Sequence, residues 1–537
     1  MKLDKLWIKD FKNLKDFSVN FDENSFVTVV IGWNGAGKSN LFEALVIIFR
    51  DLDLGKTTEF AYKIEYVCHG NRVLIENKEI RIVSDDGTEQ IKYRLQQPQV
   101  TPINLTLDGN SIKKKLPYLP AYVFGYYSGP SNRLKDHFLE HQRRYYDAVI
   151  NANKSKNIKE LKSLRKLFYA ENHHSKYVLL AFFLKNDEKI KNFLKEYLRI
   201  IGLESVLFIM KKPHYGSNNH LWGTRGLPRN LLDKLYEISL APMTLKQSVP
   251  TGIKNNSKID LYYLYVKDVN SLIELAGDYE TPSEFFAALE STDLSEVIHD
   301  VIVKVKIRNH DGTLTFRELS EGEQQLLMVL GLLRFTKEQE SLILLDEPDT
   351  HLNPFWSTQY LDLLKRIVDD EESDNKNPEQ DTRHVIMSTH DPLVIAGLVR
   401  EQIQILKRDE IDDRCYAEIP EMNPKGLGFT GILTSDMFGF RSDLDPETLA
   451  DLDKKVKLSS KDELTGDDQK ELEEINGKLD KIGLLEAFSD PYYSEFVKAW
   501  GRRTNLEQFQ KPFLSRQDKI DQAALTDEIL EEVLAEE

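Results

Sequence analysis

Residues 26–49 read FVTVVIGWNGAGKSNLFEALVIIF, and three consecutive patterns lie within them. Phe26 to Ile31 is a β-branched run typical of a buried strand, and from Phe42 to Phe49 apolar residues recur at helical spacing. Between these segments, residues 32–39 (GWNGAGKS) fit the pattern of a phosphate-binding loop. A strand, a glycine-rich turn and a helix in this order predict an α/β fold built around that loop.

Each part of this loop has its own expected role. Glycines let backbone N–H groups surround a phosphate without side-chain obstruction, and Lys38 would reach the β and γ oxygens. Ser39 begins the helix and would bind Mg²⁺ through its hydroxyl, while the helix N-terminus adds partial positive charge. The candidate nucleotide-binding residues are Gly32, Asn34, Gly35, Ala36, Gly37, Lys38, Ser39 and Asn40.

A second motif supplies paired carboxylates. Residues 342–347 (LILLDE) form an apolar run ending in two acids, which a strand would carry to the carboxyl edge of a sheet, where ligands bind. Asp346 would hold Mg²⁺ through water, and Glu347 would polarise an attacking water. Taken alone, the segment has a second interpretation, a buried strand whose end happens to be acidic.

Two further motifs flank this segment and give the chain a family resemblance. Residues 319–325 (LSEGEQQ) resemble the ABC signature sequence, and residues 388–391 (STHD) resemble a switch-histidine segment. Together with the phosphate loop and the paired carboxylates, they stand in the order found in ABC-type ATPases. The chain therefore resembles the ATPase heads of SMC and RecF proteins, over residues 1–128 and 301–406.

This resemblance implies ATP and Mg²⁺ as cofactors and an ATPase that works as a homodimer or higher oligomer. Ser320 and Gly322 of one subunit would contact the γ-phosphate held by Lys38 of the other, so that hydrolysis occurs across the dimer interface. His390 is either a sensor of the γ-phosphate or catalytic water, or a structural histidine. Where the family often has a metal-binding glutamine, residues 128–132 read SGPSN, which leaves that ligand unassigned.

The pattern of strands and helices divides the chain into four expected parts. Tyr177 to Ile201 shows helical spacing, which favours an inserted, mainly helical domain, whereas Val301 to Ile307 would return to the head. The expected fold is an ABC-type head, with a mixed sheet and an antiparallel β region, interrupted by this insert. The parts are residues 1–133 (N-terminal part of the head), 134–300 (helical insert), 301–407 (C-terminal part of the head) and 408–537 (charged helical region, a candidate partner-binding segment).

Composition narrows the class of protein. The chain has 537 residues, 41% of them hydrophobic, which is enough for a sizeable core. Its formal net charge of -17 disfavours a surface that is basic throughout and coats nucleic acid or an anionic membrane. Two cysteines without a CxxC pair indicate reduced thiols, and no apolar run approaches the roughly 20 residues of a membrane span. We expect a cytoplasmic protein with no membrane partner.

The insert and the C-terminal region narrow the family further. The insert lacks the sustained heptads of SMC coiled coils, and the sequence beyond Leu406 lacks the acidic motifs of a Toprim nuclease. The chain therefore resembles the PtuA family of ATPases in Septu and retron-associated antiphage systems. This resemblance implies a separate HNH nuclease subunit that the ATPase regulates and, in the retron form, a reverse transcriptase with its RNA/DNA product.

A DNA-repair ATPase of the RecF or SMC type that binds DNA directly is the alternative. Two basic stretches could meet phosphates, although a solvated helix face explains them as well. They comprise Lys154, Lys156, Lys159, Lys162, Arg165 and Lys166, and the pair Lys211 and Lys212.

Overall fold

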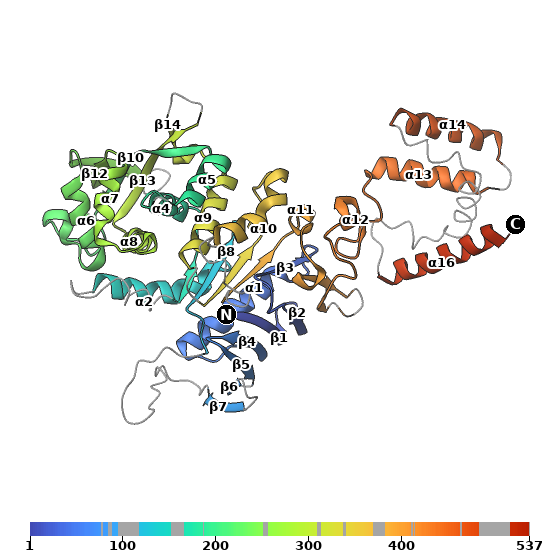
Figure 1. Ribbon diagram of the computed structural model, residues 1–537, viewed down its shortest axis with the longest axis horizontal. Helices are drawn as coiled ribbons and strands as arrows, with labels where there is room; N and C mark the ends of the chain where they lie inside the picture. The colour runs from blue at the N-terminus through green and yellow to red at the C-terminus, as the bar shows by residue number, and fades with distance from the viewer. Residues whose placement is uncertain are drawn as a thin grey trace. The chain divides into compact units, whose positions relative to one another are not determined.

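The computed structural model forms two compact units, Met1–Val394 with Glu401–Ile419, and Ile395–Arg400 with Pro420–Glu537 (Figure 1). It describes residues 1–76, 79–83, 89–94, 118–151, 166–185, 187–250, 256–308, 313–336, 340–368, 382–409, 412, 414–461, 464–482 and 516–535.

A seven-stranded sheet with the order β18-β17-β3-β16-β15-β8-β9 is the centre of the first unit. Neighbouring strands are parallel except for the pair β17 and β18. Asp346 pairs with Ser388, and Ser388 with Val30, so the carboxyl ends of β15, β16 and β3 lie at one edge. The strands are β3 (Val27–Gly32), β8 (Tyr122–Tyr127), β9 (Leu167–Tyr169), β15 (Ser341–Asp346), β16 (Arg383–Ser388), β17 (Ile403–Arg408) and β18 (Cys415–Glu418).

A six-stranded antiparallel sheet, ordered β2-β1-β4-β5-β6-β7, packs with the first sheet around helix α1 (Lys38–Leu54). The helix is buried on nearly all sides, and Phe49 contacts Tyr66 of β4 with ring centroids 5.6 Å apart. These two sheets confirm the α/β class, and the first contains the strand expected at residues 26–31. The second sheet comprises β1 (Lys2–Phe11), β2 (Leu14–Asn20), β4 (Tyr62–Cys68), β5 (Asn71–Glu76), β6 (Glu79–Val83) and β7 (Glu89–Arg94).

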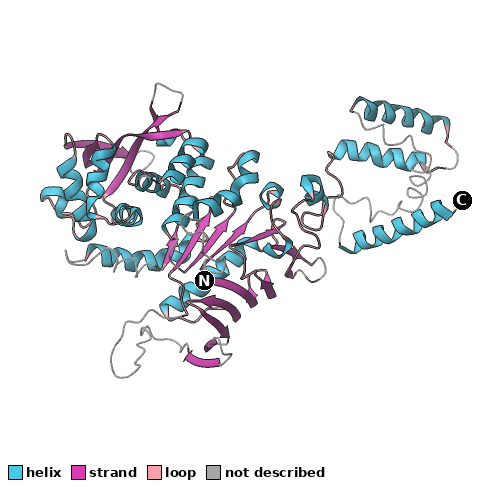
Figure 2. Ribbon diagram, viewed as in Figure 1, coloured by secondary structure: helices cyan, strands magenta, loops and turns pink. Residues whose placement is uncertain are grey.

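In the described part of residues 134–300, helices hold more residues than strands, but the insert also contains strands that the sequence did not predict there. It holds most of a five-stranded antiparallel sheet, β11-β12-β10-β13-β14, whose strands appear in magenta among the helices in Figure 2. The strands are β10 (Ile200–Lys211), β11 (Met243–Pro250), β12 (Asn256–Val266), β13 (Ile298–Ile307) and β14 (Thr313–Thr315), and the helices are α2 (Leu139–Ile150), α4 (His174–Phe182), α5 (Glu188–Tyr197), α6 (Gly226–Ile238), α7 (Val269–Leu275) and α8 (Pro282–Leu294).

Two features of this region differ from what the local sequence pattern predicts. The expected helix from Tyr177 to Ile201 is interrupted, because the Asp187 side chain accepts hydrogen bonds from the backbone at positions 189 and 190 and caps a new helix, α5. The expected return to the head at Val301 also fails, because β13 pairs with β10 of the insert rather than with the central sheet. Buried valines of β13 alternate with more exposed positions that include Lys304 and Lys306, as in a strand covered on one face.

Two helices of the first unit follow the insert in sequence. They are α9 (Glu321–Phe335), which contacts α4, and α10 (Pro354–Val368), which contacts α9; the short α11 (Pro392–Ile395) comes after β16. Leu326 to Leu330 of α9 is completely buried, so this helix is a core element of the unit. Its N-terminal end, in contrast, begins at the exposed Ser320.

The second unit is helical where the structure describes it. Leu458 of α13 packs with Ile475 and Leu479 of α14 in a small apolar core. Among the described residues of the whole chain, no helix is both long enough and apolar enough to cross a membrane. The helices of the second unit are α12 (Gly428–Thr434), α13 (Pro446–Ser459), α14 (Gly466–Lys481) and α16 (Arg516–Ala535).

Candidate nucleotide-binding site

The phosphate loop joins β3 directly to α1, as the sequence predicts. Gly32 has φ 149°, and a Cβ there would lie 2.3 Å from the carbonyl oxygen of Leu406 on β17, so a side chain has no room. Gly37 has φ 99° and is the N-cap of α1 without a side-chain cap. The first N–H groups of α1 therefore remain available to an anion such as phosphate.

Lys38 lies folded across its own loop. Its Nζ donates hydrogen bonds to the carbonyl oxygens of Gly32 at 2.7 Å and Trp33 at 3.3 Å. Burial lowers the pKa of Lys38 to about 8, although the charges of Glu347 and Asp346 act in the opposite direction. The ammonium group is thus held close to both carboxylates and to the loop that would surround the phosphates.

Asp346 ends β15 and is 2% exposed. Its Oδ1 accepts a hydrogen bond of 2.5 Å from the Ser388 hydroxyl of neighbouring β16. Burial raises the pKa of Asp346, while hydrogen bonds with Ser388 and Ser39 oppose that rise. The hydroxyl of Ser39 and the carboxylate of Asp346 therefore meet, and such oxygen donors fit Mg²⁺, which prefers one or two carboxylates together with phosphate and water.

Glu347 and His390 meet beside this pair. His390 Nε2 lies 3.1 Å from Glu347 Oε1, and the Glu347 backbone N–H donates to Ser388 Oγ at 3.0 Å. The hydrogen bond with His390 lowers the pKa of Glu347, against the opposing effect of burial. Glu347 also has φ 54°, an uncommon backbone conformation for this residue type. One hydroxyl, that of Ser388, thus fixes both consecutive acids.

The segment after Glu347 links this edge of the sheet to neighbouring loops. Asp349 accepts a hydrogen bond from the Thr389 hydroxyl, and burial raises the pKa of Asp349 to about 6. The Thr350 hydroxyl lies 2.8 Å from the carbonyl oxygen of Glu347 and 3.1 Å from the hydroxyl of Ser128. The loop after β8, where the sequence lacks the expected glutamine, is therefore in contact with the segment that follows the paired acids.

The signature motif begins α9 with a capping box. The Ser320 hydroxyl accepts from the Glu323 backbone N–H at 3.3 Å, and the Glu323 carboxylate accepts from the Ser320 N–H at 2.7 Å. Position 322 has no room for a side chain, because a Cβ on Gly322 would lie 2.4 Å from the His351 carbonyl oxygen. Within the described part of the chain, the hydrogen bonds of the Ser320 side chain stay inside this cap and do not reach residues 32–40.

The structure thus brings together most of the residues predicted from the sequence. The loop residues, Asp346, Glu347 and His390 lie at one sheet edge. Ser320 and Gly322 lie at the start of α9, where Gly322 packs against the backbone of His351. Of the basic stretches, Lys166 forms an ion pair with Asp53 at 2.9 Å, and Lys212 donates to the Asn218 side chain at 3.0 Å. The other basic residues from Lys154 to Arg165 lie outside the described residues.

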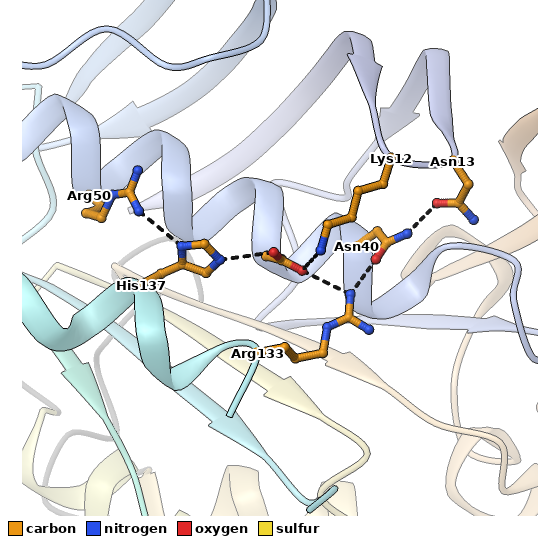
Figure 3. A network of polar contacts seen from close by, with 7 residues as sticks. Lys12, Asn13, Asn40, Arg50, Arg133 and His137 are labelled. Carbon is orange, nitrogen blue, oxygen red and sulfur yellow. Dashed lines mark hydrogen bonds and ion pairs between the residues drawn. The ribbon is translucent and has the colours of Figure 1, made fainter. Parts of the chain in front are cut away.

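A polar network behind the loop was missed by the sequence analysis (Figure 3). Its hub is the buried carboxylate of Glu43 on α1, which is bound by Lys12, Arg133 and His137. A charged residue inside the otherwise apolar run from Leu41 to Phe49 was the only signal available in the sequence. Its three partners come from two segments that are distant from Glu43 in sequence, and no local pattern reveals such contacts.

Comparison with known proteins places the chain in a family. The family model described as "AAA domain, putative AbiEii toxin, Type IV TA system" (AAA_21) matches residues 27–396, from the strand before the phosphate loop to just past His390. The chain belongs to the AAA_21 family.

Two relatives of this AAA_21 chain have names that refer to bacterial systems. It is 27% identical over 244 residues to the Septu protein PtuA of Bacillus mycoides (strain KBAB4), a match that covers 42% of this chain and 32% of PtuA. It is 22% identical over 447 residues to the "Retron Vc95 probable ATPase" of Vibrio cholerae serotype O1 biovar El Tor, covering 79% of this chain and 77% of that protein. The first match thus spans about a third of the length of PtuA.

Solved structures that align with the AAA_21 chain include SMC heads. The SMC head domain from Thermotoga maritima aligns with 13% identity and a TM-score of 0.30, covering 79% of this chain and 100% of that one. The Smc head domain with an extended coiled coil, bound to the C-terminal domain of ScpA derived from Pyrococcus furiosus, aligns with 12% identity and a TM-score of 0.30, covering 78% and 96%. The fold assignment rests on the strand order and the loop geometry described above.

Proposed function

We propose that this chain hydrolyses ATP with Mg²⁺ at a site that a second copy of the chain completes. The observation that carries the proposal is the position of Ser388, whose hydroxyl binds the Asp346 carboxylate at 2.5 Å and the Glu347 N–H at 3.0 Å. Both acids are thereby held next to Lys38, whose charge interacts with theirs. This is the donor set that phosphoryl transfer to water needs, because that reaction depends on positioning and charge stabilisation.

Each residue of the site has a defined part in this proposal. Ser39 and Asp346 would hold Mg²⁺, which neutralises charge on the phosphate oxygens, and Lys38 would bind the β and γ oxygens. Glu347 stays ionised beside His390 and orients the attacking water. Ser320, exposed at the N-terminus of α9, would add its hydroxyl and the partial positive charge of the helix end to a γ-phosphate on another copy.

A mixing experiment tests the shared site. We expect Lys38→Ala and Ser320→Arg proteins to be inactive separately, because in each homodimer both sites carry a defect. An equimolar mixture that exchanges subunits should recover about a quarter of wild-type ATP turnover, since roughly half of the dimers are mixed and each of these retains one intact site. Turnover in the mixture that equals the sum of the separate proteins would contradict a site built from two copies.

We further propose that the ATPase acts in a bacterial antiphage system, where its nucleotide state controls a separate HNH nuclease subunit. Similarity to PtuA and to the retron ATPase supports this role. For the retron form, the proposal adds a reverse transcriptase and its RNA/DNA product as partners. The C-terminal helices are the proposed partner-binding segment. Their core is small, with Leu458, Ile475 and Leu479 as its buried members, so a partner could add substantially to their packing.

Co-purification tests this biological role. The tagged chain, expressed from its native operon, is expected to bring down an HNH nuclease, and a version that ends after Ile419 should lose it while keeping ATP binding. The truncation leaves the first compact unit whole. It removes the second unit except for residues 395–400, which remain. If no nuclease is recovered and the chain instead binds DNA directly in an ATP-dependent manner, the result contradicts the nuclease-regulating role and favours a DNA-repair ATPase.

A further inference from the structure

Arg133 follows the loop in which the sequence lacks the family's glutamine, and its guanidinium points back toward α1 (Figure 3). One of its nitrogens donates to the Asn40 side chain and, at 3.0 Å, to Glu43 Oε2. Asn40 is the residue immediately after Ser39, one of the proposed Mg²⁺ ligands. The charge of Arg133 also opposes the rise in the pKa of buried Asp346. Arg133 thus binds the neighbour of Ser39 and its charge acts on Asp346, the two proposed Mg²⁺ ligands. It has no oxygen donor and is not itself a ligand.

The Glu43 carboxylate fixes this arginine in place. It is 5% exposed, and it also accepts hydrogen bonds from Lys12 Nζ at 2.5 Å and from His137 at 3.0 Å. His137 accepts from Arg50 through its other nitrogen, so its Nε2 carries the proton that binds Glu43. Although burial raises it, the pKa of Glu43 is lowered to about 2 by His137, Lys12 and Arg133. Glu43 therefore stays charged and holds three cationic or polar groups at fixed positions.

From Asn40 the network continues into the phosphate loop itself. The Asn40 amide donates to Asn13 Oδ1 at 2.5 Å, and the Asn13 amide donates to the carbonyl oxygen of Gly35 at 2.9 Å. Gly35 lies in the middle of the loop with φ 84°. A continuous chain of hydrogen bonds thus runs from Arg133, through Asn40 and Asn13, to the turn that would surround the phosphates.

We propose that Arg133, held by Glu43, is a positioning residue for nucleotide binding that fixes the phosphate loop through Asn40 and Asn13. The inference rests on the proposed ATPase function and adds a residue from outside all four sequence motifs. A loop whose backbone N–H groups are already aligned loses less freedom when phosphate binds, so preorganisation increases affinity. Arg133 is expected to affect ATP binding rather than the hydrolysis step, because neither Arg133 nor Asn40 is among the groups that polarise the attacking water.

Steady-state kinetics and ATP binding by Arg133→Gln test this role. Loss of a charge-assisted hydrogen bond should raise KM and Kd for ATP about tenfold, while kcat changes less than about threefold. Asn40→Ala breaks the chain one step closer to the loop and should give the same rise. The double variant should be no worse than either single variant, because residues that act in series are not additive. Arg133→Lys, which keeps the charge, should recover part of the affinity.

The control is Lys135→Gln, which removes a cation from the same segment. Lys135 pairs with Glu171 at 2.9 Å and takes no part in the network, so ATP affinity should be unchanged. Wild-type affinity in Arg133→Gln, a lower kcat at unchanged KM, or additive effects of the two substitutions would each overturn the inference. Wild-type protein and Lys38→Ala in the same assay keep the two proposals apart. A wild-type protein that neither binds nor hydrolyses ATP would refute the ATPase function, whereas loss of ATP binding in Lys38→Ala together with wild-type affinity in Arg133→Gln would overturn the role of Arg133 alone.

Discussion

Replacing Glu347 with glutamine is expected to slow ATP hydrolysis about 100- to 10,000-fold, the range typical for loss of a positioned general base. ATP binding should remain, because the substitution leaves the phosphate loop and the Asp346 carboxylate intact. The amide is nearly the same size as the acid, so the hydrogen bond between the Glu347 backbone N–H and Ser388 should persist. The changed property is the negative charge that orients the attacking water.

The same substitution is also expected to change the oligomeric state of the protein. If ATP is held between two copies, a protein that binds but does not hydrolyse it should accumulate as a closed dimer. We expect size-exclusion chromatography with light scattering to show the Glu347→Gln protein shifting to a dimer or higher oligomer with ATP and Mg²⁺, but not with ADP. The shift should reverse when ATP is removed by a second enzyme.

Glu188→Gln is a matched control for the same chemical change. Glu188 lies on the surface of α5, where it pairs with Lys191 at 2.9 Å with a 72% exposed side chain. Both turnover and oligomeric state should be unaffected in this variant. Wild-type turnover in Glu347→Gln would remove Glu347 from its proposed role and leave His390 or Asp349 as the group to examine next.

Replacing Lys38 with alanine is expected to weaken ATP binding by about 100-fold or more, as truncation of one partner in a buried charge pair commonly does. The ammonium is the main positive charge that the loop itself offers to the β and γ oxygens. Its removal also leaves Asp346 and Glu347 without the cation that faces them, which adds repulsion against a triphosphate. Turnover should fall with binding, in contrast to the Glu347 variant.

Equilibrium binding of a fluorescent ATP analogue measures this effect, with a thermal melt to verify folding. Lys191→Ala, which removes an exposed lysine of the insert, serves as the control and should bind as the wild type does. A thermal shift by ATP should be seen in the wild type and in the control, and be absent from Lys38→Ala. Unchanged affinity in the folded Lys38 variant would refute the assignment of residues 32–39 as the nucleotide site.

The local sequence was sufficient to predict the loop and the paired acids that the structure brings together at the candidate site. A phosphate loop depends on the backbone freedom of glycines such as Gly32, where the carbonyl of Leu406 leaves no space for a Cβ, and on a lysine at a fixed offset. The acids of β15 likewise follow from a buried strand that ends at the sheet edge. Because these requirements lie within a few consecutive residues, the motifs could be recognised before any contact was known.

Local patterns failed where pairing partners decide the structure. The segment from residue 200 to 211 became the central strand of the five-stranded sheet because β12 and β13, more than 40 residues away in sequence, supply its hydrogen bonds. The same holds for the Glu43 network, which joins Lys12, Glu43 and Arg133 from three separate segments.

The amino-acid sequence by itself determined the phosphate loop, the paired acids and the α/β class, since short-range backbone geometry and side-chain chemistry are encoded in adjacent residues. Only the tertiary structure decided that the insert contains a sheet and that Arg133 is tied to the nucleotide loop. Strand pairing and buried ion pairs depend on which distant groups meet, and their energies arise only after the chain has brought those groups out of water together.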